Sequence, residues 1–138
     1  MNDYSAFLAS KTIRASERGL AVVPDLAPHL FPFQRDCVDF LLRVGSGGLF
    51  LDTGLGKTAI ELEWCRHAAE ATNGCALILT PLAVAKQIER EGKRWGYDAR
   101  VIREQSEVGL GINVCNYDRL DKLDPSARGG THEALEDA

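Results

Sequence analysis

The feature that most constrains the fold is an apolar, strand-like run that turns through two glycines into a lysine and a threonine. It occupies residues 49–58 and reads Leu-Phe-Leu-Asp-Thr-Gly-Leu-Gly-Lys-Thr. In such a run the glycines let backbone N–H groups close around phosphate oxygens, Lys57 supplies a positive charge, and Thr58 offers a hydroxyl to Mg²⁺. A helical pattern follows directly, and the N-terminal end of a helix favours an anion. The segment therefore predicts a phosphate-binding loop between a strand and a helix.

Strand-like and helix-like segments alternate around this loop. Apolar residues at helical spacing predict helices at residues 33–43, 57–71 and 83–95. Short apolar runs bounded by turn residues predict strands at residues 49–52, 75–79, 100–103 and 112–115. Strands that alternate with helices of this length form β-α-β units. We therefore expect an α/β fold, with a small, mostly parallel sheet of about four strands flanked by helices.

Composition is that of an ordinary globular domain, with 138 residues, 45% hydrophobic and 26% charged. No apolar run approaches the roughly 20 residues of a membrane span, and the N-terminus lacks the apolar core of a signal peptide. We therefore predict a cytoplasmic protein without a membrane partner. The cysteines stand singly and predict reduced thiols in the core, at Cys37, Cys65, Cys75 and Cys115. The histidines have no metal-ligand spacing and predict structural or solvated roles, at His29, His67 and His132.

Charge argues against a protein that binds nucleic acid through bulk positive charge, because the formal net charge is −4. Basic residues nevertheless cluster after the second predicted strand, at Lys86, Arg90, Lys93, Arg94, Arg100 and Arg103. The default interpretation of this cluster is the solvated face of an amphipathic helix, and contact with nucleic acid is the alternative. Residues 124–138 predict a divergent, solvent-facing acidic tail, with mimicry of nucleic-acid charge as the alternative.

Four blocks of the sequence resemble the first lobe of superfamily-two helicases and translocases, especially the Swi/Snf-like branch and its bacteriophage relatives. The blocks are Leu-Phe-Pro-Phe-Gln-Arg-Asp at 30–36, the loop at 49–58, Leu-Ile-Leu-Thr-Pro-Leu-Ala-Val-Ala-Lys-Gln-Ile-Glu-Arg-Glu at 77–91, and Ile-Asn-Val-Cys-Asn-Tyr-Asp-Arg-Leu at 112–120. They follow the family's order. One departure is Leu51, where the strict loop pattern has glycine or alanine, and the resembling branch tolerates it.

The resemblance implies a partial RecA-like P-loop domain and a nucleotide site. In that site Gln34 would read the adenine edge of ATP or ADP, and Thr58 would bind Mg²⁺. The remaining cofactor-binding residues would form the phosphate loop, at Thr53, Gly54, Leu55, Gly56, Lys57 and Thr58. The blocks at 77–91 and 112–120 would meet a nucleic-acid strand.

The family's next element is an apolar strand ending in Asp-Glu, whose carboxylates hold Mg²⁺ and orient the attacking water. No such strand follows Leu123 in the sequence. We therefore divide the chain into an N-terminal arm and connector at 1–29, a truncated P-loop domain at 30–123, and the acidic tail at 124–138. We expect this chain not to be an active enzyme.

Two functional hypotheses follow. In the first, the chain is a non-hydrolysing remnant of a helicase that binds ATP or ADP through Gln34, Lys57 and Thr58. In the second, it is a phage-type binding or decoy protein that inhibits a larger helicase, nuclease or nucleoprotein machine. An anti-defence protein directed at a CRISPR-type effector complex is a concrete version of the second hypothesis.

Overall fold

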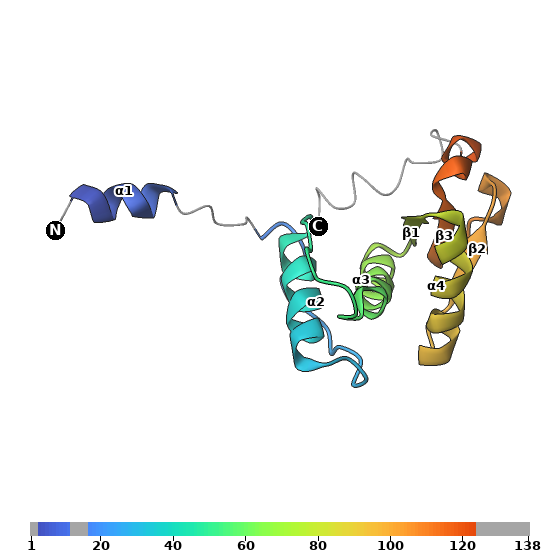
Figure 1. Cartoon of the computed structure of the whole chain (residues 1–138), viewed down its shortest axis with the longest axis horizontal. Coiled ribbons are helices and arrows are strands. Elements are labelled where there is room, and N and C mark those ends of the chain that lie inside the picture. The colour runs from blue at the N-terminus through green and yellow to red at the C-terminus, as the bar shows by residue number, and fades with distance from the viewer. Residues whose placement is uncertain (1–2, 12–16, 124–138) are drawn as a thin grey trace.

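The computed structural model describes residues 3–11 and 17–123 and has an α/β architecture, which confirms the predicted fold class (Figure 1). Its elements in chain order are α1 (Asp3–Lys11), α2 (Pro32–Val44), α3 (Lys57–Thr72), β1 (Cys75–Thr80), α4 (Leu82–Trp95), β2 (Ala99–Ile102), the 3-10 helix η1 (Gln105–Glu107), β3 (Gly111–Asn116) and the 3-10 helix η2 (Tyr117–Lys122). The predicted helices and three of the four predicted strands are therefore confirmed. The acidic tail predicted at 124–138 lies outside the described residues. Within them, no helix has the length and apolar character that a membrane crossing requires.

The sheet has three parallel strands in the order β1-β3-β2. Ala76 of β1 and Ala99 of β2 both pair with Ile112 of the central strand, so these three residues share one face. Helices α3 and α4 pack against that face and enclose the main core, where Leu62 and Val114 have no exposed surface. On the opposite face, three residues form a small cluster, Ile102, Cys115 and Leu123.

The fourth strand predicted, at residues 49–52, is wrong. These residues have no strand assignment and pair with no other segment of the described chain. An extended run becomes a sheet strand only when a neighbouring backbone supplies hydrogen-bond partners. Here the carbonyls of Leu51 and Asp52 accept from the Lys57 ammonium instead, at 2.6 and 2.8 Å. Phe50 is left 98% exposed.

A second apolar cluster joins α2 to α3, and α3 lies between α2 and the sheet (Figure 1). Its buried members are Leu30, Val38, Leu42 and Ile60. The segment before α2 closes this cluster, since the amides of Gly19 and Leu20 donate to the carbonyls at the end of α2, 2.8 and 2.7 Å away. Part of the predicted connector within 1–29 therefore belongs to the folded unit.

A buried carboxylate ties three segments of the fold together. Glu63 of α3 has no exposed side-chain surface and accepts hydrogen bonds from the Ala27 amide at 2.9 Å, the Arg66 guanidinium at 2.6 Å, His67 Nε2 at 2.8 Å and the Tyr97 hydroxyl. Burial alone would raise the pKa of Glu63, but these four hydrogen bonds stabilise the charged form and lower its pKa overall. For Tyr97, burial and the Glu63 carboxylate raise the pKa of the hydroxyl. Sequence reasoning missed this centre, although Glu63 and His67 stand four residues apart on a predicted helix.

Candidate phosphate-binding site

The loop before α3 depends on two glycines in left-handed backbone conformations. Gly54 has a φ of +81° and Gly56 a φ of +72°. Residues with side chains rarely adopt such angles, so both positions favour glycine. Gly56 has a second constraint, because a Cβ atom placed on it would lie 2.4 Å from Gln34 Nε2. The backbone conformation and the contact with Gln34 together fix this turn.

The amides of residues 54–58 donate to no acceptor in the part of the chain that the structure describes. On either side the amides are satisfied, since Thr53 N donates to Asp52 Oδ1 at 2.8 Å and Ala59 N donates to the Gly56 carbonyl at 3.1 Å. The free donors are therefore confined to the loop and the first two residues of α3. A helix of 16 residues adds the positive end of its dipole at the same place. This arrangement suits an anion with several oxygens.

Lys57 and Thr58 are the first residues of α3. The Lys57 ammonium lies against the backbone of the loop entry, where it donates to the carbonyls of Leu51 and Asp52. Thr58 is half-buried beside it. Both side chains thus stand at the same helix end as the free amides. A phosphate oxygen would offer Lys57 a charged acceptor in place of two neutral ones.

Gln34 connects the start of α2 to the loop. Its side chain is 5% exposed, and Oε1 accepts from the Phe31 amide at 2.9 Å while Nε2 donates to the Leu55 carbonyl at 3.0 Å. The structure therefore brings Gln34 and the loop together, although 21 residues separate Gln34 from Leu55. Both ends of the amide hold protein backbone, and contact between Gln34 and adenine stays a prediction.

Two aromatic rings beside Gln34 escaped sequence reasoning. Phe31 and Phe33 stack with their ring centroids 6.4 Å apart and their planes 7° from parallel, and they are 65% and 40% exposed. They flank Pro32 at the start of the helix that carries Gln34. The signal in the sequence was this alternation of aromatic residues just before Gln34. Such exposed ring faces offer a surface on which a flat base can stack.

For Mg²⁺ the chain offers the Thr58 hydroxyl and no preformed cage. Among the described residues, no three His, Cys, Asp or Glu side chains gather in a way that could hold a metal ion. Mg²⁺ usually keeps several waters and binds through substrate phosphates and one or two protein groups. The donor set therefore fits Mg²⁺ only as a companion of bound phosphates. Glu61, one turn after Lys57, is a further carboxylate in this helix, and desolvation raises its pKa.

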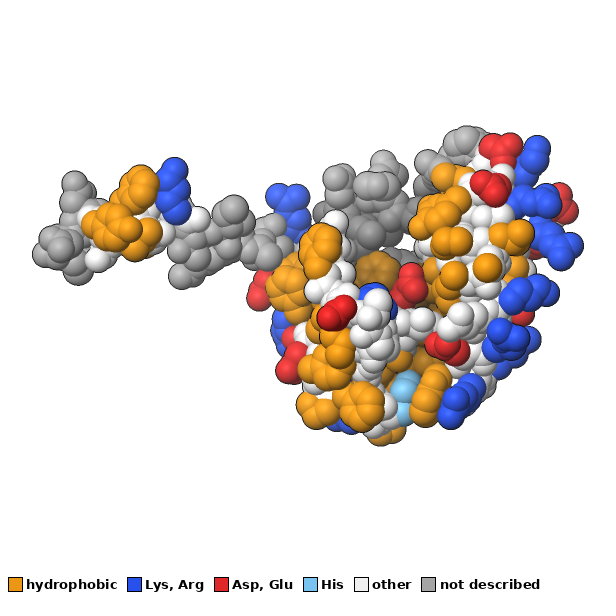
Figure 2. Space-filling model, viewed as in Figure 1, with side chains coloured by type: hydrophobic (Ala, Val, Ile, Leu, Met, Phe, Trp, Pro, Cys, Tyr) orange, Lys and Arg blue, Asp and Glu red, His pale blue; other side chains and the backbone are white. Residues whose placement is uncertain are grey.

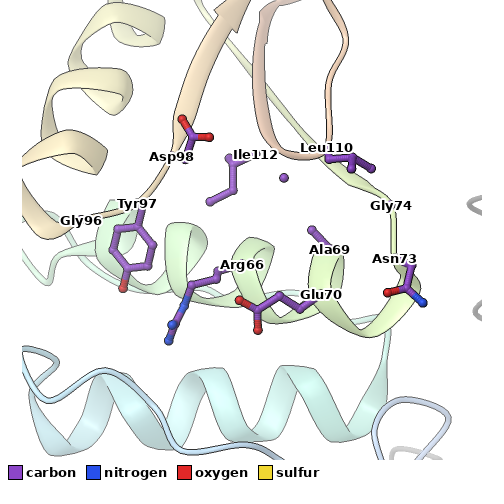
Figure 3. A pocket seen from close by; sticks show the side chains of 11 residues that line it. Arg66, Ala69, Glu70, Asn73, Gly74, Gly96, Tyr97, Asp98, Leu110 and Ile112 are labelled. Carbon is purple, nitrogen blue, oxygen red and sulfur yellow. The ribbon is translucent and has the colours of Figure 1, made fainter.

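A cavity of about 450 Å³ lies at the opposite end of α3, where all three strands begin (Figure 3). Ala69 and Ile112 line it, and Arg66 and Glu70 lie on its α3 side. The turn amides around it are already used, since Gly74, Tyr97 and Gly111 each donate to a backbone carbonyl. Among the described residues, the cavity therefore lacks a run of consecutive free amides like the one at residues 54–58.

No protein-family model matches this chain, and no solved structure matches it. The resemblance to superfamily-two helicases therefore rests on the four sequence blocks alone, and it stays a prediction.

Proposed function

We propose that this chain binds ATP or ADP through the loop at residues 53–58. The observation that carries the proposal is the set of free amides at residues 54–58, which stand at the positive end of α3 beside the Lys57 ammonium. Phosphate chains are held in proteins by this combination of backbone donors, helix dipole and a lysine. Free phosphate alone would satisfy the same donors, so the nucleotide part of the proposal rests on Gln34 and its neighbouring rings.

The base would lie near the start of α2. Gln34 supports the loop from one side through its bond to the Leu55 carbonyl, and the stacked rings of Phe31 and Phe33 face solvent beside it. Stacking on aromatic rings supplies affinity for any base, while a side-chain amide can distinguish the edge of adenine from other edges. Mg²⁺ would enter with the phosphates and take Thr58 as its protein ligand.

The proposed role is binding without turnover. Phosphoryl transfer depends on several groups that position the attacking water and stabilise developing charge. The carboxylates next to the loop in sequence are Asp52, whose Oδ1 already accepts from the Thr53 amide, and Glu61 on α3. We therefore expect no hydrolysis above background.

Calorimetric titration with ATP and ADP in the presence of Mg²⁺ tests the proposal. We expect saturable binding that Lys57→Ala weakens by at least about tenfold, because a charge-assisted contact to phosphate is lost. The matched control is Lys86→Ala, which removes an exposed lysine from α4 and should leave nucleotide affinity unchanged. Absence of heat and of any thermal shift at millimolar nucleotide would refute nucleotide binding, and steady phosphate release would refute the absence of turnover.

A second candidate function is a binding or decoy protein that engages a helicase, nuclease or CRISPR-type effector complex. It is favoured by the unpaired run at residues 49–52, where Phe50 is 98% exposed, and by β1, which is an edge strand of the described sheet. Exposed apolar residues and free strand edges are common features of protein interaction sites. If this function holds, Lys57→Ala should retain inhibition of a purified effector complex and Phe50→Asp should lose it. The reverse pattern would exclude it.

A further inference from the structure

A row of unpaired cations runs along the outward side of α4. Lys86, Arg90 and Lys93 are spaced four and three residues apart, which places them on one face of the helix, and all three are exposed. Figure 2 shows lysine and arginine side chains following one another down the edge of the molecule where α4 and β2 lie. These side chains make no ion pair within the described residues.

The helix carries two carboxylates of its own, and both are engaged elsewhere. Glu89 is four residues before Lys93, a spacing that favours an ion pair on a helix. Its Oε1 instead accepts from the Val101 amide of β2 at 3.3 Å. Glu91 accepts from Gln87 Nε2 at 2.9 Å. The positive row therefore keeps its charge, because the carboxylates of α4 serve the adjacent strand and a neutral neighbour.

An apolar side chain marks one end of the row. Leu82, four residues before Lys86, is 71% exposed. Trp95, two residues after Lys93, lies on the other side of the helix, where its ring stacks on His29 with the centroids 4.5 Å apart. The row from Leu82 to Lys93 spans about 16 Å, or three helical turns. Leu82 at one end and three cations after it give this surface a defined direction.

We propose that the α4 row, defined as Leu82, Lys86, Arg90 and Lys93, docks an acidic amphipathic helix of a protein partner. The inference rests on the second candidate function and adds a separate interaction surface to the one proposed at residues 49–52 and β1. A partner helix with carboxylates three and four residues apart would meet the three cations in register, and an apolar residue one turn away would meet Leu82. Charge complementarity selects an anionic partner.

Local charges favour a protein over a nucleic acid. The whole chain has a formal net charge of −4. Around β2, the strand next to α4, Asp98 pairs with Arg100 at 3.1 Å, and the exposed carboxylates of Glu104 and Glu107 follow Arg103 in the sequence. A continuous phosphate backbone would pass these carboxylates and be repelled, whereas a short helix would meet the row alone. The binding surface is therefore suited to discrete carboxylates.

The test is fluorescence anisotropy with a labelled acidic helical peptide of about 20 residues, long enough to form a helix by itself. We expect saturable binding that weakens with added salt, because exposed charge pairs are screened. A peptide with glutamine in place of every glutamate should not bind. Arg90→Glu should weaken binding about fivefold to tenfold, and Leu82→Ser should weaken it without changing its dependence on salt.

The matched control is Arg119→Glu, which makes the same change in net charge on exposed η2 and should have no effect. Circular dichroism of each variant should match that of the parent chain, because Arg90 is exposed. Equal binding of the glutamine peptide, equal losses in Arg119→Glu and Arg90→Glu, or tighter binding of single-stranded DNA than of the acidic peptide would overturn the proposal. Phe50→Asp should keep peptide binding, so failure of the row and failure of the second candidate function give different results.

Discussion

Replacing Glu63 by alanine should destabilise this fold more than any exposed substitution on α3. The carboxylate is fully buried and accepts from four donors. Two of the donors, Tyr97 and His67, are themselves 5% and 3% exposed. When the carboxylate is removed, His67 and the half-buried Ala27 amide lose their acceptor, whereas the Tyr97 hydroxyl keeps His29 Nε2 at 3.2 Å. Arg66 is half-exposed and can recover hydration, so it adds less.

The size of the stability loss follows from how many donors keep no acceptor after the substitution. Each buried donor left without a partner costs about 1–3 kcal/mol. Two such donors predict a loss of about 2–6 kcal/mol in the free energy of unfolding, a range that includes the usual cost of about 3–5 kcal/mol for removing one member of a buried ion pair. Glu63→Gln keeps an acceptor oxygen for Ala27 and His67, removes the charge and puts an NH2 group in place of the oxygen that accepts from Tyr97, so we expect about 1–2 kcal/mol.

Urea denaturation followed by circular dichroism measures these free energies. The control is Glu70→Ala on the same helix, where the side chain is 65% exposed and the loss should stay within about 0.5 kcal/mol. A loss below about 1 kcal/mol for Glu63→Ala would refute the reasoning. Equal losses for the alanine and glutamine variants would show that the charge, rather than the hydrogen bonds, carries the effect.

Three further predictions concern the same fold. The folded-state pKa of Glu63 lies below its ordinary value of 4.5, so its contribution to stability is complete above that value and is lost as pH falls through the folded-state pKa. Thermal melts below about pH 5 should therefore show a steeper decline for the parent chain than for Glu63→Gln. Gly56 has a φ of +72°, and a Cβ atom placed on it would lie 2.4 Å from Gln34, whereas Gly54 has a φ of +81° and no atom within 4 Å of such a Cβ. Gly56→Ala should therefore reduce stability and nucleotide affinity more than Gly54→Ala. A smaller loss for Gly56→Ala, by melting and calorimetry, would contradict this. Burial and the Glu61 charge raise the pKa of the Cys65 thiol to about 12. Iodoacetamide at neutral pH should therefore alkylate half-exposed Cys37 in the folded chain and Cys65 only after unfolding. Peptide mass spectrometry measures both modifications.

Local sequence pattern predicted most of the secondary structure. Spacing of apolar residues placed α2, α3 and α4 within about two residues of their ends. A helix satisfies its own backbone, so the pattern within one segment is enough to specify it. The run at residues 49–52 has an equally apolar pattern and forms no strand, because a strand needs hydrogen bonds from a second segment.

In the candidate site, too, the sequence predicted some features and the tertiary structure added others. The sequence identified the loop residues, because the glycines, the lysine and the threonine stand together in the chain. It did not identify the contact between Gln34 and the Leu55 carbonyl, nor the stacked rings of Phe31 and Phe33. These depend on how α2 packs against the start of α3.

By itself, then, the sequence determined where helices begin, which loop carries free amides and a lysine, and that the chain is an α/β protein. Only the tertiary structure decided that β3 lies between β1 and β2. It also decided that Glu63 collects donors from residues as distant as Ala27 and Tyr97. Within the residues that the structure describes, it leaves Lys86, Arg90 and Lys93 without an ion pair. The physical reason is that charge and burial at these positions are set by neighbours far along the chain, whereas turns and helices are set by residues a few positions away.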